Sequence, residues 1–444
     1  MELDAREDGS SRLSPNHRWN FFPSVSIGWR LSQEDFWTSL KPVLQEFKVR
    51  ASYGVLGNDR LPGGNNNALY YRDASIIGNA ADNLNAGMNW VFDGTMYTPM
   101  AIIQSPNNVC TWEKTAVTNI GIDGNVWNSD FSYTIDYFNK KTTGMLMTEV
   151  VSNVNGGGNY VANVGSMKNY GAEFTVNYAH TTSFGLKYKL NANYSFMTNK
   201  ILDLGGQGIT QVNNQVGYVL NPFYLYVYAG LLTKDEYVNQ KPNDPSTPLL
   251  AGQQWGDQKI LDVNEDGKIT SLDKTVINKN GVPKNLYGLN FDVSYKGIGI
   301  AGMIQGAANF YKYLGGSVGY GFNQGYSISQ WAIDNSYNPL VNENNYNTRL
   351  PRVSVSNTIN YGYGSTLFLF NSSYARLKNL QVYYELPKTI LDNIKIKYVR
   401  VYVSGQNLYT VSKIPKELGI DPEMGSYGGY PLLRTFTVGL NVTF

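Results

Sequence analysis

The pattern with the clearest chemistry lies at residues 262–273, where oxygen-bearing side chains recur at regular intervals. The first three are two positions apart, a spacing that lets a tightly turning loop aim them at one point, and a glycine follows where the chain must turn. We predict a Ca²⁺ site with these ligands: Asp262, Asn264, Asp266, the carbonyl of Lys268, Thr270 and Asp273. The pattern matches an EF-hand loop, except that aspartate replaces the usual final glutamate. The alternative interpretation is an ordinary solvated turn rich in Asp, Asn and Gly.

Aromatic residues in the long connections form a second candidate set, because sugars stack on aromatic rings and hydrogen-bond to nearby amides. The residues that we predict to contact substrate are Trp90, Tyr97, Tyr224, Trp255 and Trp331, with Tyr218, Tyr226 and Tyr337 as further members of the set. The alternative interpretation, that these rings pack the connections together, accounts for them equally well.

Other reactive residues give no sign of catalysis. Cys110 is the only cysteine, so no intrachain disulfide or cysteine-based metal site can form. His17 and His180 lie far apart and lack the spacing of a metal site or catalytic triad, so we expect both at strand ends on the surface. Residues 156–158 are three glycines without the flanking strand and helix of a phosphate-binding loop, and we expect a loop tip there. We therefore predict that the protein is not an enzyme.

The composition limits the class of protein. The 444-residue chain is 14% aromatic and 16% charged, with 34 Tyr and 45 Gly, which favours many short strands and turns over surface helices. A net charge of +2 gives no basis for binding nucleic acid. No apolar run approaches the roughly 20 residues of a membrane-spanning helix. Residues 1–8 are acidic, so we expect no signal peptide there.

Apolar and polar residues alternate with a period of two along most of the chain, which is typical of β-strands. The stretches that we predict as strands are 21–31, 47–55, 112–123, 131–139, 172–178, 186–196, 287–295, 298–310, 373–386, 397–408 and 436–444. Within 373–386 the apolar phase slips between Leu377 and Leu380, which predicts a β-bulge.

Two features distinguish these strands from the sheets of a soluble protein. Their apolar sides are rich in aromatic residues, as in a wall that crosses two membrane–water interfaces, and their other sides carry charges and amides suited to a wet lumen. Long connections, at about 57–111, 144–165, 199–285, 311–372 and 410–432, alternate with short turns. In a meander the long connections then share one end of the sheet, as the extracellular loops of outer-membrane barrels do.

The predicted fold class is therefore all-β, an antiparallel transmembrane β-barrel meander of about 11 strands plus a stub, with long extracellular loops. We treat residues 1–444 as one domain. The connection 199–285 is its longest extracellular loop and carries the calcium motif.

Several motifs, in order along the whole chain, resemble SusC/RagA-type TonB-dependent importers. The earlier ones lie at 6–12, 22–30, 48–54, 57–58, 112–115, 136–138, 163–165 and 171–174. The most specific lie near the C-terminus: Ser373-Tyr374-Ala375-Arg376-Leu377-Lys378-Asn379-Leu380, Gln406-Asn407-Leu408, Asp421-Pro422-Glu423 and Tyr430-Pro431-Leu432-Leu433-Arg434.

This resemblance implies the C-terminal half of a 22-stranded barrel in the cell outer membrane, with the plug domain and TonB box outside this stretch. It also implies import of oligosaccharides or oligopeptides, a SusD-like surface lipoprotein as partner, and energy from the TonB complex acting through the missing N-terminal part. Two alternatives stay open. One is a secreted all-β carbohydrate-binding protein, which needs a dry core instead of a lipid-facing belt, and the other is a non-functional gene fragment.

Overall fold

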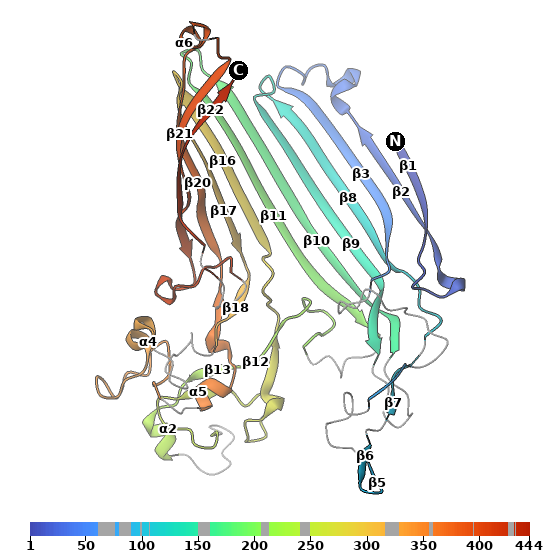
Figure 1. Ribbon diagram of the computed structural model, residues 1–444, viewed down its shortest axis with the longest axis vertical. Helices are drawn as coiled ribbons and strands as arrows, with labels where there is room; N and C mark the ends of the chain where they lie inside the picture. The colour runs from blue at the N-terminus through green and yellow to red at the C-terminus, as the bar shows by residue number, and fades with distance from the viewer. Residues whose placement is uncertain are drawn as a thin grey trace. The chain divides into compact units, whose positions relative to one another are not determined.

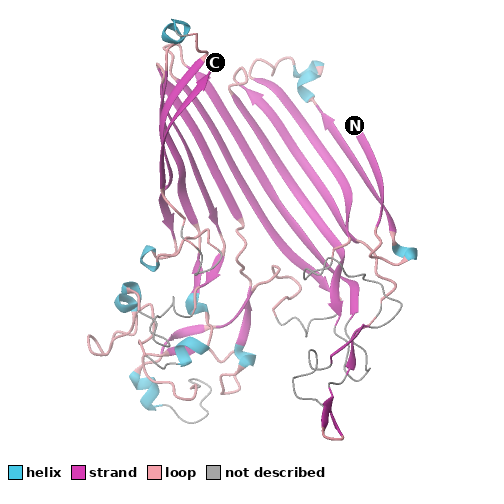
Figure 2. Ribbon diagram, in the orientation of Figure 1, coloured by secondary structure: helices cyan, strands magenta, loops and turns pink. Residues whose placement is uncertain are grey.

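The computed structural model describes residues 1–60, 76–79, 90–97, 100–105, 107–149, 160–205, 213–239, 249–315, 328–354, 358–393, 395–424, 430 and 432–444. Strands dominate, and the helices are short and confined to connections (Figure 2). The chain divides into two compact units, Met1–Phe174 with Met197–Leu220 and Thr175–Phe196 with Asn221–Phe444. In the ranges just given, no helix is both long enough and apolar enough to cross a bilayer.

Twelve long strands form one sheet, which we call the wall, in the order β1-β2-β3-β8-β9-β10-β11-β16-β17-β20-β21-β22 (Figure 1). The strands that begin in the first unit are β1 (Glu2–Gly9), β2 (Trp19–Trp29), β3 (Leu44–Asn58), β8 (Glu113–Val126), β9 (Phe131–Glu149) and β10 (Tyr160–Thr181). Those that begin in the second are β11 (Lys187–Leu204), β16 (Asn285–Tyr295), β17 (Ile298–Ala308), β20 (Tyr374–Glu385), β21 (Tyr398–Ser412) and β22 (Thr435–Thr443). Each neighbouring pair whose register is described is antiparallel.

The eleven strands predicted from alternation are all present and in order, so the predicted fold class is confirmed. The stub is β1, which pairs with β2 along its whole length. The predicted bulge is also present. The register of β20 shifts between Leu377 and Asn379 against both of its neighbours. Lys378 is the one extra residue against β17, whereas against β21 it lies opposite two residues, 407 and 408.

One predicted connection is too long. The sequence places it at 144–165, but β9 continues to Glu149 and β10 begins at Tyr160. These strand ends have no strict alternation, because Met145, Leu146 and Met147 follow one another in β9. Leu146 and Met147 are nonetheless both buried, since each face of the strand is covered there.

Short turns close the other ends of the hairpins. Trp127, Asn128 and Ser129, between β8 and β9, all have positive φ angles of 55–69°, so a single left-handed turn reverses the chain. Lys296 and Gly297, with φ of 48° and 87°, form the two-residue turn between β16 and β17. A six-residue helix, α6 (Lys388–Asn393), lies between β20 and β21.

The longest connections of the second unit are folded. We call residues 221–284 and 309–373, so far as they are described, the loop body. Its strands are β12 (Phe223–Tyr226), β13 (Tyr228–Leu231), β14 (Gln258–Ile260), β15 (Lys274–Ile277), β18 (Tyr311–Tyr313) and β19 (Leu369–Asn371), and its helices are α2 (Lys234–Asn239), α4 (Gln330–Asn335) and α5 (Thr358–Gly362). Two-stranded sheets join β12 to β15, β13 to β14 and β18 to β19. Figure 1 shows these elements gathered beyond the lower ends of β16, β17 and β20.

The loop body has its own apolar core. One buried cluster contains Leu314, Trp331, Ala332, Leu350, Leu367, Phe368, Phe370 and Ile414, and another contains Tyr226, Leu250, Ile260 and Ile359. In the first unit, the connection between β3 and β8 contains β4 (Ile76–Asn79), β5 (Trp90–Phe92), β6 (Thr95–Tyr97) and β7 (Met100–Gln104). A third cluster lies at the end of that unit's wall, made of Leu13, Phe22, Cys110, Trp112, Leu146 and Val161.

Candidate functional site

The wall has two chemically different faces. In the second unit, cross-strand neighbours join into two apolar rows that each run from β22 to β16. The rows are Leu440, Val401, Tyr384, Ile298 and Tyr295, and Val438, Val403, Val382, Ile300 and Val293. Val401 and Val403 are the fourth and sixth residues of β21 and pair with strands on both sides, yet they are 43% and 53% exposed. Such a belt is expected where side chains face lipid, and we call this side the apolar face.

The opposite side of the same strands, the charged face, carries hydrogen-bonded polar groups. Arg400 on β21 donates to Glu385 on β20, with 2.5 Å between Nη2 and Oε1. The hydroxyl of Tyr383 donates to Asp292 over 2.6 Å, and its ring passes over Gly299 on the strand between them. Because a Cβ at Gly299 would lie 2.2 Å from this ring, only glycine leaves room for the hydrogen bond.

The charged face of the first unit has an ion network that spans three strands. Arg50 on β3 donates from Nε to Asp123 on β8 at 3.0 Å and from Nη2 to Asp136 on β9 at 2.6 Å. Its guanidinium reaches β9 by crossing Gly121, where a Cβ would lie 2.5 Å from Arg50 Cζ. The apolar face of the same strands carries a row of Ile27, Ala51, Ile120 and Tyr137. Both units therefore present one charged and one apolar side.

A buried arginine on the wall forms ion pairs with the connection after β21. Arg376 on β20 is 1% exposed, and its Nη2 donates to Asp421 over 2.5 Å. Its Nη1 lies 3.1 Å from Glu423, and Lys378 donates to the same carboxylate at 3.2 Å. Burial raises the pKa of Glu423, but hydrogen bonds from Lys378 and Gln305 and the nearby Arg376 lower it by more. These residues belong to two of the motifs that carry the family resemblance, which the sequence alone gave no reason to place together.

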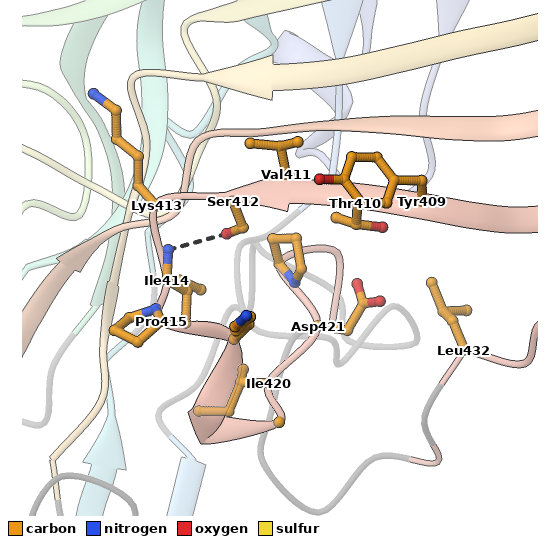
Figure 3. A pocket seen from close by; sticks show the side chains of 13 residues that line it. Tyr409, Thr410, Val411, Ser412, Lys413, Ile414, Pro415, Ile420, Asp421 and Leu432 are labelled. Carbon is orange, nitrogen blue, oxygen red and sulfur yellow. Dashed lines mark hydrogen bonds between the residues drawn. The ribbon is translucent and has the colours of Figure 1, made fainter. Parts of the chain in front are cut away.

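An open cavity of about 520 Å³ lies beside the Arg376–Asp421 ion pair, between the end of β21 and the segment that follows it (Figure 3). Tyr409, Lys413, Ile420, Asp421 and Leu432 are among its lining residues. None of the aromatic residues predicted to contact substrate lines this cavity.

The core of the loop body contains a buried polar network. Asp257 is fully buried and accepts hydrogen bonds from Arg352 Nε at 2.7 Å and Asn360 Nδ2 at 2.9 Å. The neighbouring Gln258, also fully buried, donates to the carbonyls of Ile359 and Tyr363 and accepts from Ser365. Every bond of this set joins the connection before β16 to the connection after β17. Buried polar groups satisfied in this way hold two segments in one arrangement.

The predicted calcium motif lies in the same loop body, between β14 and β15. Asp273 is fully buried, and its carboxylate accepts from the backbone N–H groups of Val263 at 2.9 Å and Thr270 at 2.7 Å. Burial raises the pKa of Asp273, but these donors, the N–H of Asn264 and the adjacent Asp262 carboxyl lower it by more.

The other predicted ligands are arranged differently. Asp262 is 8% exposed, and one carboxylate oxygen accepts from the N–H of Gly267 at 2.8 Å. Asn264 and Asp266 are exposed and hydrogen-bond to each other at 3.0 Å. Thr270 caps the short 3₁₀ helix Ser271–Asp273 together with Asp273. The structure thus brings Asp262 and Asp273 together and leaves Asn264 and Asp266 outside. Over the described part of the chain, no three His, Cys, Asp or Glu side chains are gathered as a metal site.

The predicted aromatic contacts fall into three groups. Trp331 is 7% exposed and packs edge-on against Phe370, so its indole belongs to the core of the loop body and offers no surface to a ligand. Tyr226 and Tyr337 are buried in the same way, which supports the packing interpretation for these three. Tyr97 is exposed on β6, while Tyr218, Tyr224 and Trp255 are half-buried, the last against Tyr237. Trp90 lies on β5, but its side chain is outside the described residues, as are residues 156–158.

The remaining reactive residues have structural surroundings. Cys110 is buried, its thiol donates to the carbonyl of Val161, and burial raises its pKa to about 11. His17 bonds to the hydroxyl of Ser14, and His180 stacks beside Tyr178 at the end of β10. Each histidine lies near a strand end, as expected.

Comparisons with known proteins agree with this architecture. A family model described as "TonB dependent receptor-like, beta-barrel" matches residues 2–408. The TonB-dependent receptor P3 of Formosa agariphila is 28% identical over 99% of this chain and 43% of its own length. The TonB-dependent receptor SusC of Bacteroides thetaiotaomicron is 28% identical over 99% of this chain and 41% of its own length.

Among solved structures, the RagAB peptide transporter has a similar fold, with a TM-score of 0.74 and 22% sequence identity. The match covers 100% of this chain and 45% of the transporter chain. At this identity the likeness shows the fold. The chain spans less than half the length of each of these relatives.

Proposed function

Because this chain belongs to the TonB dependent receptor-like β-barrel family, we propose that it forms the C-terminal part of the barrel of a SusC/RagA-type nutrient importer. Barrels of this family lie in the outer membrane, and so does this one. The proposed cargo is an oligosaccharide or an oligopeptide. A SusD-like surface lipoprotein is the proposed partner, and the TonB complex would act through a part of the protein outside this chain.

The observation that carries the proposal is the division of the wall into two faces. An exposed apolar belt on one side and hydrogen-bonded ions on the other suit a wall between lipid and a water-filled passage. A secreted binding protein would instead bury its apolar faces between packed sheets. In the described residues the large buried clusters lie in the connections and at strand ends, while mid-strand valines and isoleucines stay exposed.

The motifs that resemble SusC/RagA-type importers favour an oligosaccharide or an oligopeptide as cargo, and the fold shared with the RagAB peptide transporter is compatible with peptides. The charged face favours polar cargo of either class, since its residues offer both charges and amides. Transport of this kind makes and breaks no covalent bond in the cargo, so no catalytic residue is proposed.

Uptake by the bacterium that encodes this chain tests the proposal. The gene would be deleted, and uptake of fluorescent oligosaccharides and oligopeptides of graded length compared with the parent. We expect loss of uptake for one cargo class, restored by the wild-type gene in trans. Unchanged uptake of every compound in both classes would refute the proposed import. The tagged intact protein, extracted in mild detergent, should co-purify with a surface lipoprotein, and its isolation alone would refute that partner.

A further inference from the structure

The loop between β14 and β15 contains a buried carboxylate oxygen without a hydrogen-bond donor. It is Oδ1 of Asp262, whose side chain is more than nine-tenths buried. The other oxygen of this carboxylate is occupied by the N–H of Gly267. A buried anionic oxygen without a donor is strongly unfavourable, so the position requires a cation or a proton.

The unpaired oxygen belongs to a carboxyl that interacts with a second, fully buried one. The Asp262 carboxyl lies within hydrogen-bonding reach of the Asp273 carboxyl. Both oxygens of Asp273 already accept backbone N–H groups, from Val263 and Thr270, which fixes its carboxylate in place. Two adjacent buried carboxylates repel each other unless positive charge lies between them.

We propose that Asp262 and Asp273 are the two fixed ligands of a Ca²⁺ ion, which the loop completes by turning Asn264 and Asp266 inward. The donor set consists of carboxylate, amide and carbonyl oxygens, without histidine or cysteine, and such hard oxygen ligands select Ca²⁺ over transition metals. Asn264 and Asp266 are exposed, and their side chains hydrogen-bond to each other and to the N–H groups of Asp266 and Lys268. Their inward rotation therefore breaks only hydrogen bonds within the loop. Gly267, at φ 79°, supplies the sharp turn that this loop requires.

The place of the site in the fold indicates what the ion does. Residues 261–273 join β14, which begins with the fully buried Gln258, to β15, which pairs with β12. An ion bound to Asp262 at one end of this segment and Asp273 at the other closes the segment into a ring. It would therefore hold the β12–β15 and β13–β14 sheets together inside the loop body. The role is structural and does not depend on which cargo is carried.

Hydrogen exchange of the intact protein in detergent, after removal of divalent ions with EGTA, provides the test. Addition of CaCl₂ should slow exchange in residues 258–277, with half-saturation at roughly 10⁻⁴–10⁻³ M, the range of weak extracellular sites. Asp262→Asn keeps the acceptor for Gly267 but removes the charge, and should weaken the response at least tenfold. Glu265→Gln, in the same loop but with an exposed side chain, is the matched control and should respond like wild type.

Three results would overturn the proposal. One is the absence of any calcium response in the folded wild-type protein at about ten times the upper end of that range. Another is an equal response to MgCl₂, which would exclude a calcium-selective site. The third is a loop that is more protected at acidic than at neutral pH and insensitive to calcium, which would show that the two carboxyls share a proton.

Discussion

Arg376 Nη2 lies 2.5 Å from Asp421 Oδ2, although the two residues are 45 positions apart and one is in the wall while the other is in a connection. The contact joins the motif around 373–380 to the motif at 421–423. The two motifs therefore supply the two sides of a single ion cluster around the buried Arg376.

Arg376→Ala should loosen the connection between β21 and β22. Removal of one partner from a fully buried ion pair costs about 3–5 kcal/mol. Asp421 and Glu423 are partly exposed and Glu423 keeps Lys378, so we expect a cost below that range. We expect faster proteolysis near residues 413–424 and a lower midpoint of thermal unfolding in detergent. Lys378→Ala, at a partly exposed partner of Glu423, is the control and should cost about 0–1 kcal/mol. Equal effects of the two changes would contradict the assignment of the buried arginine as the anchor.

Gly121→Ala should weaken assembly of the wall. The added methyl would lie 2.5 Å from Arg50 Cζ and 2.7 Å from Asp136 Oδ1, so the ion pair must separate. Overpacking of this kind costs about 1–3 kcal/mol. Gly362→Ala meets no atom within 4 Å and is the matched control. The measurement is outer-membrane abundance of the intact protein, and equal abundance of the two variants would show that Arg50 can move aside freely.

Val401→Arg should impair membrane assembly, while Gln406→Arg should be tolerated. Val401 belongs to an apolar row, whereas Gln406 lies on the charged face of the same strand, opposite Asn379 and Thr435. A charge on the lipid side costs about 2–4 kcal/mol at the bilayer midplane and less toward the interfaces. Val401 is the fourth residue of β21, so we expect a cost below the midplane value. Heat-modifiable migration on gels reports the folded fraction of each variant. If both variants assemble equally well, the two faces have been assigned wrongly.

The loop body should lose stability in acid through Glu236. Burial raises the pKa of Glu236, but hydrogen bonds from Lys259 and from the N–H and hydroxyl of Thr233 lower it by more. A carboxyl whose folded-state pKa is depressed stabilises the fold above its unfolded-state pKa of about 4.3, and this contribution disappears as pH falls through the lower folded value. We expect the emission change of Trp255, isolated by difference from Trp255→Phe, to begin below about pH 4.3. In Glu236→Gln this acid dependence should shrink, and an identical acid profile would exclude Glu236 as its source.

The strands of the wall were predicted well, because the alternation that indicates a strand lies within the strand's own residues. Alternation with a period of two shows through in β11, β16 and β22 whatever lies next to them. The bulge in β20 was equally visible as a slip of phase. The sequence did not place the stub, and strand β1 was not predicted at its position, because its acidic residues show no apolar stripe and its pairing comes from β2.

The candidate sites were less predictable, because their geometry depends on contacts between distant segments. The spacing at residues 262–273 identified a set of possible ligands, but not that Asp262 and Asp273 alone would be buried together. As tryptophans in long connections, Trp331 and Trp255 were equal candidates for substrate contact. The structure distinguishes them, because Trp331 is buried in the core and Trp255 is half-buried. The Asp257–Arg352 pair gave no local signal, since its members are 95 positions apart.

The 95 positions between Asp257 and Arg352 also bear on the order in which the hairpin and the loop body fold. Asp257 and Gln258 precede the β16–β17 hairpin, while their partners Arg352, Asn360 and Ser365 follow it. Closing a chain of about 100 residues costs several kcal/mol of entropy in an unfolded protein, and far less once a hairpin has already brought its ends near each other. We therefore expect the β16–β17 hairpin to pair before the polar network of the loop body closes.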